Sequence, residues 1–253
     1  MMRRAIEVET MDEISFELAE KFIVTIFSRA PYAASQYLRT LKAAFTRAVV
    51  WGYIIQNPFS KVRIPRLPRP LPAFINQAEL QLVLEKTETQ DLRDIFTTAF
   101  HTGMRRGEIV NLKWGSVDLS ASILKVESTK GFSTKWKKER IIPLNRTMVE
   151  TLRRRKSAQG LQTSSDLVFL TKKGRQYNDE FVGKKFKAAA RAAGLSERIH
   201  LHSLRHSFAS NLVQKDVTIL VVKELLGHEK LSTTQIYAHV KNENLVAAVS
   251  RLD

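Results

Sequence analysis

Four prolines interrupt the sequence between residues 63 and 72, which reads Arg-Ile-Pro-Arg-Leu-Pro-Arg-Pro-Leu-Pro. Proline lacks a backbone N–H and disfavours helical geometry at the preceding residue, so this segment is neither a helix nor a central strand. Its composition favours an extended, semi-rigid strap. We therefore predict a domain boundary here, with one domain over residues 1–70 and a second over 73–253.

Hydrophobic residues recur at helical spacing on both sides of this strap. In the first domain Ile14, Leu18 and Phe22 are four residues apart, and Leu38 and Phe45 share a face of a second helix. The same reasoning along the chain predicts helices over residues 12–29, 33–55, 76–87, 91–101, 105–112, 146–158, 178–193, 202–214, 218–226, 232–239 and 241–251.

Short apolar segments interrupt the helical pattern in the second domain. Residues 122–127 and 139–143 are predicted as strands on either side of a lysine-rich turn. Residues 167–170 form either a third short strand or a buried loop. The expected fold class is therefore mainly α with a small β-sheet, in two domains.

The chain is strongly basic, with 41 Lys and Arg against 25 acids and a net charge of +16. No acid occurs between Lys21 and Ala78, whereas this stretch holds nine Lys or Arg. An ordinary solvated surface mixes both signs, so we expect this stretch to follow the phosphate backbone of a nucleic acid. The alternative is a basic surface with no polyanionic partner. The candidate DNA contacts on helix 33–55 and the strap are Arg39, Lys42, Arg47, Arg66 and Arg69.

The sequence contains no cysteine, which excludes disulfides, thiol catalysis and cysteine-ligated zinc. No apolar run reaches the roughly 18 residues of a membrane span. Glu7 and Glu9 stand where a signal peptide needs an apolar stretch. We therefore expect an untargeted, cytoplasmic protein.

Basic residues suited to holding a phosphate occur in two distant patterns. His202 and Arg205 are three apart on a predicted helix and so share one face. A guanidinium offers a planar fork of donors that matches two phosphate oxygens. Arg105 follows Thr-Gly at a predicted break between helices, and Glu108 could fix an arginine there. Taken singly, each of these residues is more often an ordinary surface residue.

Tyr237 is a candidate nucleophile. A phenol has a pKa of about 10 and attacks poorly without a base or nearby positive charge. Arginines and histidines, His228 among them, can supply the positive charge and the base. A half-buried structural tyrosine is nevertheless the simpler interpretation. Lys130, in the turn between the predicted strands, could act as a general acid. Lys135, Lys137 and Lys138 compete for that role, and a solvated turn is the alternative.

Neither a metal nor a nucleotide cofactor is expected. His202 and His206 are four apart, but the Glu of a His-Glu-x-x-His zinc site is missing and no carboxylate cluster accompanies them. The sequence also has no Gly-x-x-x-x-Gly-Lys loop for nucleoside triphosphates.

Taken together, the motifs resemble the tyrosine recombinases, also called the phage integrase family. The stretch 201–240 is especially similar to bacterial Xer-type enzymes and to phage or transposon integrases. The motifs that carry the resemblance, in chain order, are Thr-Gly-Met-Arg (102–105), Lys130, His-Ser-Leu-Arg-His-Ser-Phe-Ala (202–209), Leu-Leu-Gly-His (225–228) and Thr-Thr-Gln-Ile-Tyr (233–237).

The resemblance implies roles for the basic residues. Arg105 and Arg205 would clamp the scissile phosphate of DNA. His202 would contact the same phosphate and assist proton transfer from the tyrosine, and His228 would support the phosphate as well.

It implies the chemistry too. Tyr237 would attack the phosphorus and leave a 3′-phosphotyrosyl link, while Lys130 would protonate the leaving 5′ oxygen. Glu108 is similar to a structural acid near the first arginine. Removing one preorganised donor from such a site typically costs roughly 10²–10³ in rate.

The expected function is therefore site-specific cutting and rejoining of DNA. A DNA-binding relative with little catalytic activity and a type IB topoisomerase-like relaxing enzyme are the alternatives. The resemblance further implies a helical, SAM-like core-binding domain over 1–70, a catalytic domain over 73–253, and tetramers on two duplexes. The helix 241–251 would dock on a neighbouring subunit. The family's core-binding domain usually has one more helix than 1–70 can hold, so we expect a shortened one.

Overall fold

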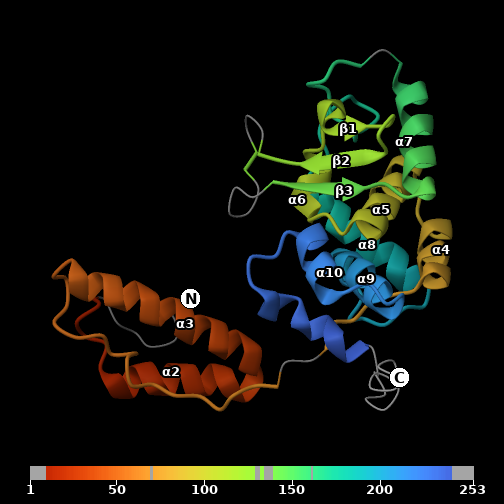
Figure 1. Cartoon of the computed structure of the whole chain (residues 1–253). Coiled ribbons are helices and arrows are strands. Elements are labelled where there is room, and N and C mark those ends of the chain that lie inside the picture. Colours follow the sequence, from red (N-terminus) through yellow and green to blue (C-terminus); the bar gives the residue numbers. More distant parts are fainter. Residues whose placement is uncertain (1–9, 69–70, 129–131, 134–138, 161, 241–253) are drawn as a thin grey trace, which may run out of the picture. The chain divides into compact units, whose positions relative to one another are not determined.

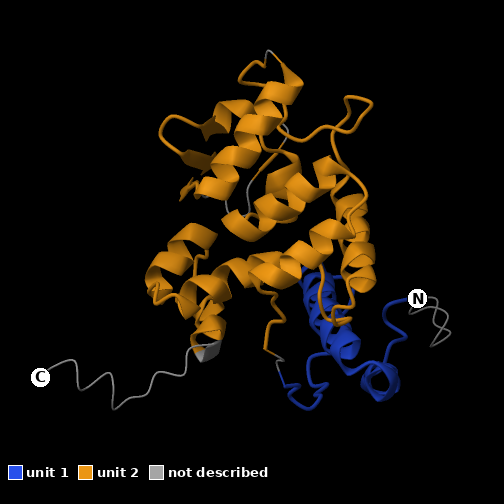
Figure 2. Ribbon diagram, turned by 90° about the vertical axis from the view of Figure 1, so that its right-hand side faces the viewer, with its two compact units in different colours: residues 1–70 blue, residues 71–253 orange. Residues whose placement is uncertain are grey.

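The computed structural model describes residues 10–68, 71–128, 132–133, 139–160 and 162–240 (Figure 1). Backbone contacts divide the chain into two compact units, Met1–Pro70 and Leu71–Asp253 (Figure 2). The division falls within the proline-rich strap. Among the described helices, none is long and apolar enough to cross a membrane.

Unit 1 is built on two helices, α2 (Phe16–Arg29) and α3 (Pro31–Val50). The Ser15 hydroxyl caps α2 by accepting a hydrogen bond from the Leu18 N–H, and Pro31 opens α3 at the position where its missing N–H costs nothing. The two helices bury one shared apolar cluster, whose largest members are Phe22, Ile23, Leu38, Phe45 and Phe59. The apolar periodicity predicted Phe22, Leu38 and Phe45 on this face correctly, whereas the predicted Leu18 is not a member of the cluster.

The predicted end of the second helix at residue 55 is wrong, because α3 ends at Val50. Gly52 has a φ of +77°, which turns the chain out of the helix. Asn57 then anchors the returning chain, since its side-chain amide donates to the Lys42 carbonyl at 2.9 Å and to the Thr46 hydroxyl at 3.0 Å. These contacts are long-range, so helical periodicity could not reveal them.

Unit 2 is mainly helical, with one three-stranded sheet. Its helices are α4 (Gln77–Glu85), α5 (Gln90–Thr102), α6 (Arg106–Val110), α7 (Arg146–Gln159), α8 (Asp179–Ala192), α9 (Leu201–Gln214) and α10 (Ile219–Leu226). The antiparallel sheet has the order β1 (Val117–Asp118), β2 (Ile123–Val126) and β3 (Arg140–Pro143). In Figure 1 the sheet and α7 lie at one end of the unit, and α9 and α10 lie at the other.

Two details of unit 2 differ from the sequence prediction, and one further predicted helix is not tested. The third strand is β1, whose two residues are too few to predict, whereas residues 167–170 form a buried loop with isolated bridges at Leu167 and Leu170. The predicted helix 232–239 is instead a pair of 3₁₀ segments, η3 (Leu231–Thr233) and η4 (Gln235–Val240). The predicted helix 241–251 lies outside the described residues.

Helix α5 is the central element of unit 2. Nine of its thirteen residues are buried, and its main packing partner is α9. The buried Asp94 accepts a hydrogen bond from Arg155 at 3.0 Å and from Arg154 at 2.5 Å, so a charge inside the core is paired. Helix α5 ends at Gly103, whose φ of +62° is the left-handed conformation typical of helix C-caps. This end of α5 lies against α9, and the first of the predicted catalytic residues follows it in the chain.

Candidate active site

Arg105 stands between α5 and α6 and is fixed by Glu108. The Arg105 backbone N–H donates to the Glu108 carboxylate at 2.7 Å, and its guanidinium Nη1 donates to the same carboxylate at 2.9 Å. Glu108 thereby caps the short helix α6 and orients the arginine. The Arg105 side chain remains 25% exposed, so it keeps donors for a ligand.

Arg140, at the start of β3, is a site residue that the sequence analysis missed. Its guanidinium donates to both Glu108 oxygens, at 2.6 and 3.1 Å, and its Nε donates to the Leu225 carbonyl at 2.9 Å. Burial alone would raise the pKa of Glu108, but the hydrogen bonds and charges of Arg140 and Arg105 lower it to about 2. An ionised Glu108 therefore joins α6 to β3, and Arg140 in turn joins β3 to the end of α10.

Arg205 is buried on α9, with 3% of its surface exposed. Its Nη1 donates to the Gly103 carbonyl at 2.5 Å and its Nη2 to the Leu226 carbonyl at 2.6 Å. Burial, followed by the charges of Arg105 and Arg140, lowers its pKa to about 9. The group stays cationic at neutral pH, inside the protein and beside two other guanidiniums. Such an arrangement attracts an anion.

Two histidines line the same cluster. Helix α9 begins at Leu201 because His200 and Ser203 cap it reciprocally, and this places His202 in the first turn. Desolvation by the surrounding protein, then Arg205, lowers the pKa of His202 to about 4, although the side chain keeps an exposed edge. His228, just after α10, shares a hydrogen bond of 2.9 Å between Nδ1 and the Thr234 hydroxyl.

Burial, then Arg205 and Arg105, lowers the pKa of His228 to about 3. Both His202 and His228 are therefore neutral near pH 7, and each has one N–H that could donate to an anionic oxygen. An anion bound at the arginines would raise both pKa values, because an opposite charge favours the protonated ring.

Tyr237 is almost completely buried, with 1% exposed. Its ring packs in an apolar cluster with Ala209, Val222 and Leu226, on the inner faces of α9 and α10. Its hydroxyl lies 2.7 Å from His206 Nδ1. Burial raises the pKa of Tyr237 to about 12, and Arg205 opposes that rise. The sequence analysis considered His206 as a metal ligand and missed its contact with the tyrosine.

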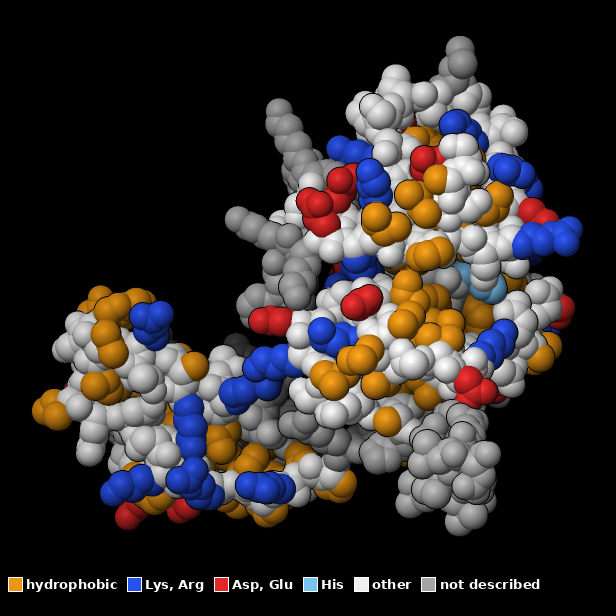
Figure 3. Space-filling view, in the orientation of Figure 1, with side chains coloured by type: hydrophobic (Ala, Val, Ile, Leu, Met, Phe, Trp, Pro, Cys, Tyr) orange, Lys and Arg blue, Asp and Glu red, His pale blue; other side chains and the backbone are white. Residues whose placement is uncertain are grey.

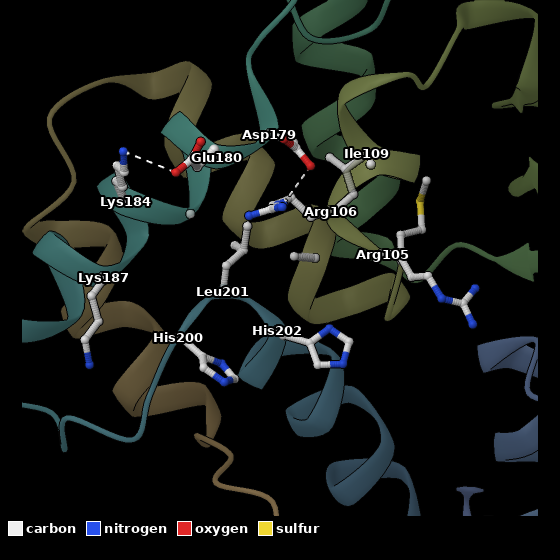
Figure 4. Close-up of a pocket in the computed structure, with 14 residues that line it drawn as sticks. Arg105, Arg106, Ile109, Asp179, Glu180, Lys184, Lys187, His200, Leu201 and His202 are labelled. Carbon is white, nitrogen blue, oxygen red and sulfur yellow. Dashed lines mark ion pairs between the residues drawn. The ribbon is translucent and has the colours of Figure 1, made fainter. Parts of the chain in front are cut away.

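An open pocket of about 660 Å³ adjoins this cluster (Figure 4). Its lining includes Arg105 from the junction between α5 and α6, His202 from α9, and Lys184 and Lys187 from α8. Asp179 pairs with Arg106 at 2.9 Å and Glu180 pairs with Lys184 at 3.3 Å, which neutralises part of the positive charge. Within the described parts of the chain, no group of three or more His, Cys, Asp or Glu is arranged to hold a metal ion.

The fold thus brings together five of the six predicted catalytic side chains, namely Arg105, His202, Arg205, His228 and Tyr237. The sixth, Lys130, and its competitors Lys135, Lys137 and Lys138 lie outside the described residues.

Arg39, Arg47 and Arg66 are exposed on unit 1, and Figure 3 shows Lys and Arg side chains distributed over this unit. Lys42 is partly buried, and its ammonium donates to the Val62 carbonyl at 2.9 Å. Lys42 therefore holds the segment after α3 onto that helix, which the sequence analysis did not foresee. Arg69 is not among the described residues.

Comparison with known proteins identifies the family. The profile of the Phage integrase family matches residues 73–244, which is more than half of the chain. This chain belongs to the phage integrase family. It is a tyrosine recombinase, an enzyme of site-specific DNA recombination, and the resemblance drawn from the sequence motifs is confirmed.

Xer-type enzymes are among the relatives of this chain. A tyrosine recombinase of Thermosipho africanus is 30% identical over 222 residues, which cover 86% of this chain and 75% of the relative. Tyrosine recombinase XerD of Lacticaseibacillus casei is 31% identical over 229 residues, covering 87% and 76% respectively.

Solved integrase structures share the fold. The Tn1549 transposon integrase in complex with transposon right end DNA has a TM-score of 0.77 at 19% identity, covering 99% of this chain and 91% of its own. A λ integrase dimer bound to a COC′ core site has a TM-score of 0.74 at 22% identity, covering 92% and 85%. A λ integrase tetramer bound to a Holliday junction has a TM-score of 0.74 at 22% identity, covering 90% and 68%. The predicted fold class is confirmed.

Proposed function

We propose that this tyrosine recombinase cuts and rejoins double-stranded DNA at specific sites, with Tyr237 as the nucleophile and a 3′-phosphotyrosyl intermediate. One observation carries the proposal. Buried Arg205 lies close enough to Arg105 for the charge of Arg105 to help depress its pKa, and close enough to buried Tyr237 to oppose the rise that burial causes in the pKa of the phenol. A phosphodiester between the two guanidiniums would relieve their repulsion and lie near the phenol oxygen.

The cleavage step follows from this arrangement. The phenol oxygen forms a bond to phosphorus, and the bond from phosphorus to the 5′ oxygen breaks. Negative charge grows on the two non-bridging oxygens, where Arg105 and Arg205 donate from fixed positions. The N–H groups of His202 and His228 supply further donors. The product is another phosphodiester, so the bond energy is retained for rejoining, and no step requires a metal or a nucleotide.

The leaving 5′ oxygen needs a proton. We assign this role to Lys130 on the resemblance of the sequence, with Lys135, Lys137 and Lys138 as the competing candidates. Replacing each lysine in turn with Ala identifies the general acid. Loss of the general acid should slow cleavage of a substrate with a 5′-oxygen leaving group the most. The same variant should cleave a substrate with a 5′-thio leaving group at close to the wild-type rate.

Binding and assembly belong to the same proposal. The exposed Arg39, Arg47 and Arg66, together with Arg69, would contact phosphates of the duplex. The λ integrase neighbours are a dimer on a core site and a tetramer on a Holliday junction. We propose the same homo-tetramer for this chain during synapsis, with helix 241–251 docked on the next subunit. Because DNA is the proposed substrate, we further propose that the enzyme acts in the cytoplasm.

The test begins with the DNA site. Selection of bound duplexes from a random-sequence library by the full chain would supply it. When a duplex of that sequence carries a nick next to the cleavage position, cleavage releases the short 5′-hydroxyl fragment that would otherwise attack and reverse the reaction. The covalent protein–DNA product therefore accumulates and is measured on a denaturing gel. We expect an adduct with the wild type and none with Tyr237→Phe, while both bind the site equally.

Other results on the same substrate would contradict the proposal. Tight binding without any adduct indicates a DNA-binding relative, and relaxation of supercoils without site preference indicates a topoisomerase-like enzyme. An adduct formed by Tyr237→Phe would exclude Tyr237 as the nucleophile.

A further inference from the structure

The hydroxyl of Tyr237 has a defined partner to which the family resemblance assigns no role, although it lies within the motif 202–209. His206 follows Arg205 on α9, and its Nδ1 lies 2.7 Å from the Tyr237 oxygen. In the tautomer that carries its proton on Nε2, the phenol O–H donates to Nδ1. The tyrosine ring itself is enclosed by apolar side chains of α9 and α10. The nucleophile is therefore buried, with an imidazole nitrogen at hydrogen-bond distance.

His206 also lies next to the phosphate-binding part of the site. Its ring meets the His202 ring edge-to-face, with the centroids 4.9 Å apart. The titratable and charged groups around it are His202 and Arg205 on its own helix, His200 at the helix N-cap, and Tyr237 on η4. The ring thus lies between the phenol and the group expected to contact the scissile phosphate.

We propose that His206 holds the Tyr237 hydroxyl for attack and accepts its proton, in place of His202, to which the family resemblance assigns assistance of this transfer. The inference rests on the proposed function. As the phenol oxygen bonds to phosphorus, its proton moves to His206 Nδ1, and the electron pair of the breaking P–O bond goes to the 5′ oxygen. On rejoining, the 5′ hydroxyl attacks the phosphotyrosine, and the His206 imidazolium returns the proton to the phenol oxygen. The only other proton in the two steps is the one that the general acid gives to the 5′ oxygen on cleavage and takes back on rejoining.

The electrostatics of the pair make the nucleophile dependent on its substrate. Without an anion, burial and then His202 lower the pKa of His206 to about 4, whereas burial raises the pKa of Tyr237 to about 12. The proton accordingly stays on the phenol. A phosphodiester bound beside His202 adds a negative charge that favours a protonated His206. Proton transfer therefore becomes easier when DNA occupies the site.

The decisive variant is His206→Gln. The glutamine amide keeps a hydrogen-bonding side chain near the phenol but does not titrate. We expect its single-turnover rate of adduct formation on the nicked site to fall by about 10², the lower end of a general-base contribution. The dissociation constant for the same DNA and the midpoint of thermal unfolding should match those of the wild type. His206→Phe, which removes the acceptor altogether, should lose at least as much rate.

Two readouts distinguish proton acceptance from a structural role. The rate of the wild type should rise with pH and then level off, whereas the rate of His206→Gln should keep rising, because only solvent base remains. A substrate with a 5′-thio leaving group needs no proton on departure, since a thiol has an ordinary pKa of about 8.5. That substrate should therefore restore a general-acid variant but not His206→Gln. His101→Gln is the matched control, because His101 lies at the end of α5 with its Nδ1 against Asn145.

The inference is overturned if His206→Gln keeps the wild-type rate and pH profile, or if the 5′-thio substrate restores it. A wild-type chain that forms no adduct would instead overturn the proposed function itself. If His206→Phe unfolds, the glutamine variant decides the question alone.

Discussion

The guanidinium of Arg205 donates a hydrogen bond of 2.5 Å to the carbonyl of Gly103, although the two residues are 102 positions apart. A second hydrogen bond, to the Leu226 carbonyl, ties the same group to the end of α10. Arg205 thus satisfies the C-terminal ends of two helices while it faces the charge of Arg105. A residue assigned to phosphate binding is at the same time part of the core.

The two arginines should therefore fail in different ways. In Arg205→Ala the carbonyls of Gly103 and Leu226 lose a buried donor, at roughly 1–3 kcal/mol each. We expect urea unfolding to show a loss of about 2–5 kcal/mol, with no adduct formed. Arg105→Ala leaves Glu108 paired with Arg140, so it should lose less than about 1 kcal/mol while the cleavage rate falls by about 10²–10³. Equal losses of stability in the two variants would refute this division.

Local patterns predicted much of this architecture. Apolar periodicity located α5 and α9, and the short motifs identified the residues that gather at the site. Arg140 escaped notice because a basic residue opening a strand has no local signal of its distant partner, Glu108. His206 was read with its helix neighbours, whereas its partner, Tyr237, comes from η4. The misplaced end of α3 has the same origin, in tertiary contacts that follow from the packed chain.

Glu108 should make stability depend on pH. Its pKa falls from 4.5 to about 2 on folding, which corresponds to about 3 kcal/mol of stability at neutral pH. Because the folded pKa is the lower one, this contribution is complete above about pH 5 and is lost as the pH falls toward 2. We expect Glu108→Gln to be less stable than the wild type at pH 7, and the difference in urea unfolding free energy to narrow by pH 3.

The control is Glu197→Gln. Glu197 also has a pKa lowered to about 2, through hydrogen bonds from Arg191 and then Lys187, but it lies exposed on the surface. Solvent screens such a pair, so this variant should unfold at nearly the wild-type urea concentration. If the difference in urea unfolding free energy between the wild type and Glu108→Gln stays constant from pH 7 to pH 3, the charge of the carboxylate is not what stabilises the fold.

Gly103 should tolerate no side chain. Its φ of +62° is unfavourable for any other residue, and a Cβ there would lie 2.5 Å from the Phe208 ring and 3.0 Å from Leu226 Cδ2. Gly174 has a similar φ of +68° with open space around it. We expect Gly174→Ala to cost about 1–2 kcal/mol from backbone strain alone, and Gly103→Ala to cost about 1–3 kcal/mol more from overpacking. Thermal or urea unfolding measures the loss of stability in each variant. Equal losses would show that α5 and α9 move apart to accommodate the added methyl group without a further loss of stability.

DNA binding should depend steeply on salt, and unit 1 should carry part of that dependence. The logarithm of the association constant falls with the logarithm of salt concentration with a slope of about −0.9 per phosphate contact. Arg39 and Arg47 are exposed on α3, within the acid-free stretch. The double variant Arg39→Ala/Arg47→Ala should therefore flatten the slope by about 2 × 0.9 between 50 and 200 mM salt, as measured by fluorescence anisotropy. Arg191→Ala is the control, because Glu197 already pairs with Arg191 at 2.8 Å. An unchanged slope in the double variant, or an equal change in the control, would contradict a phosphate-binding role for α3.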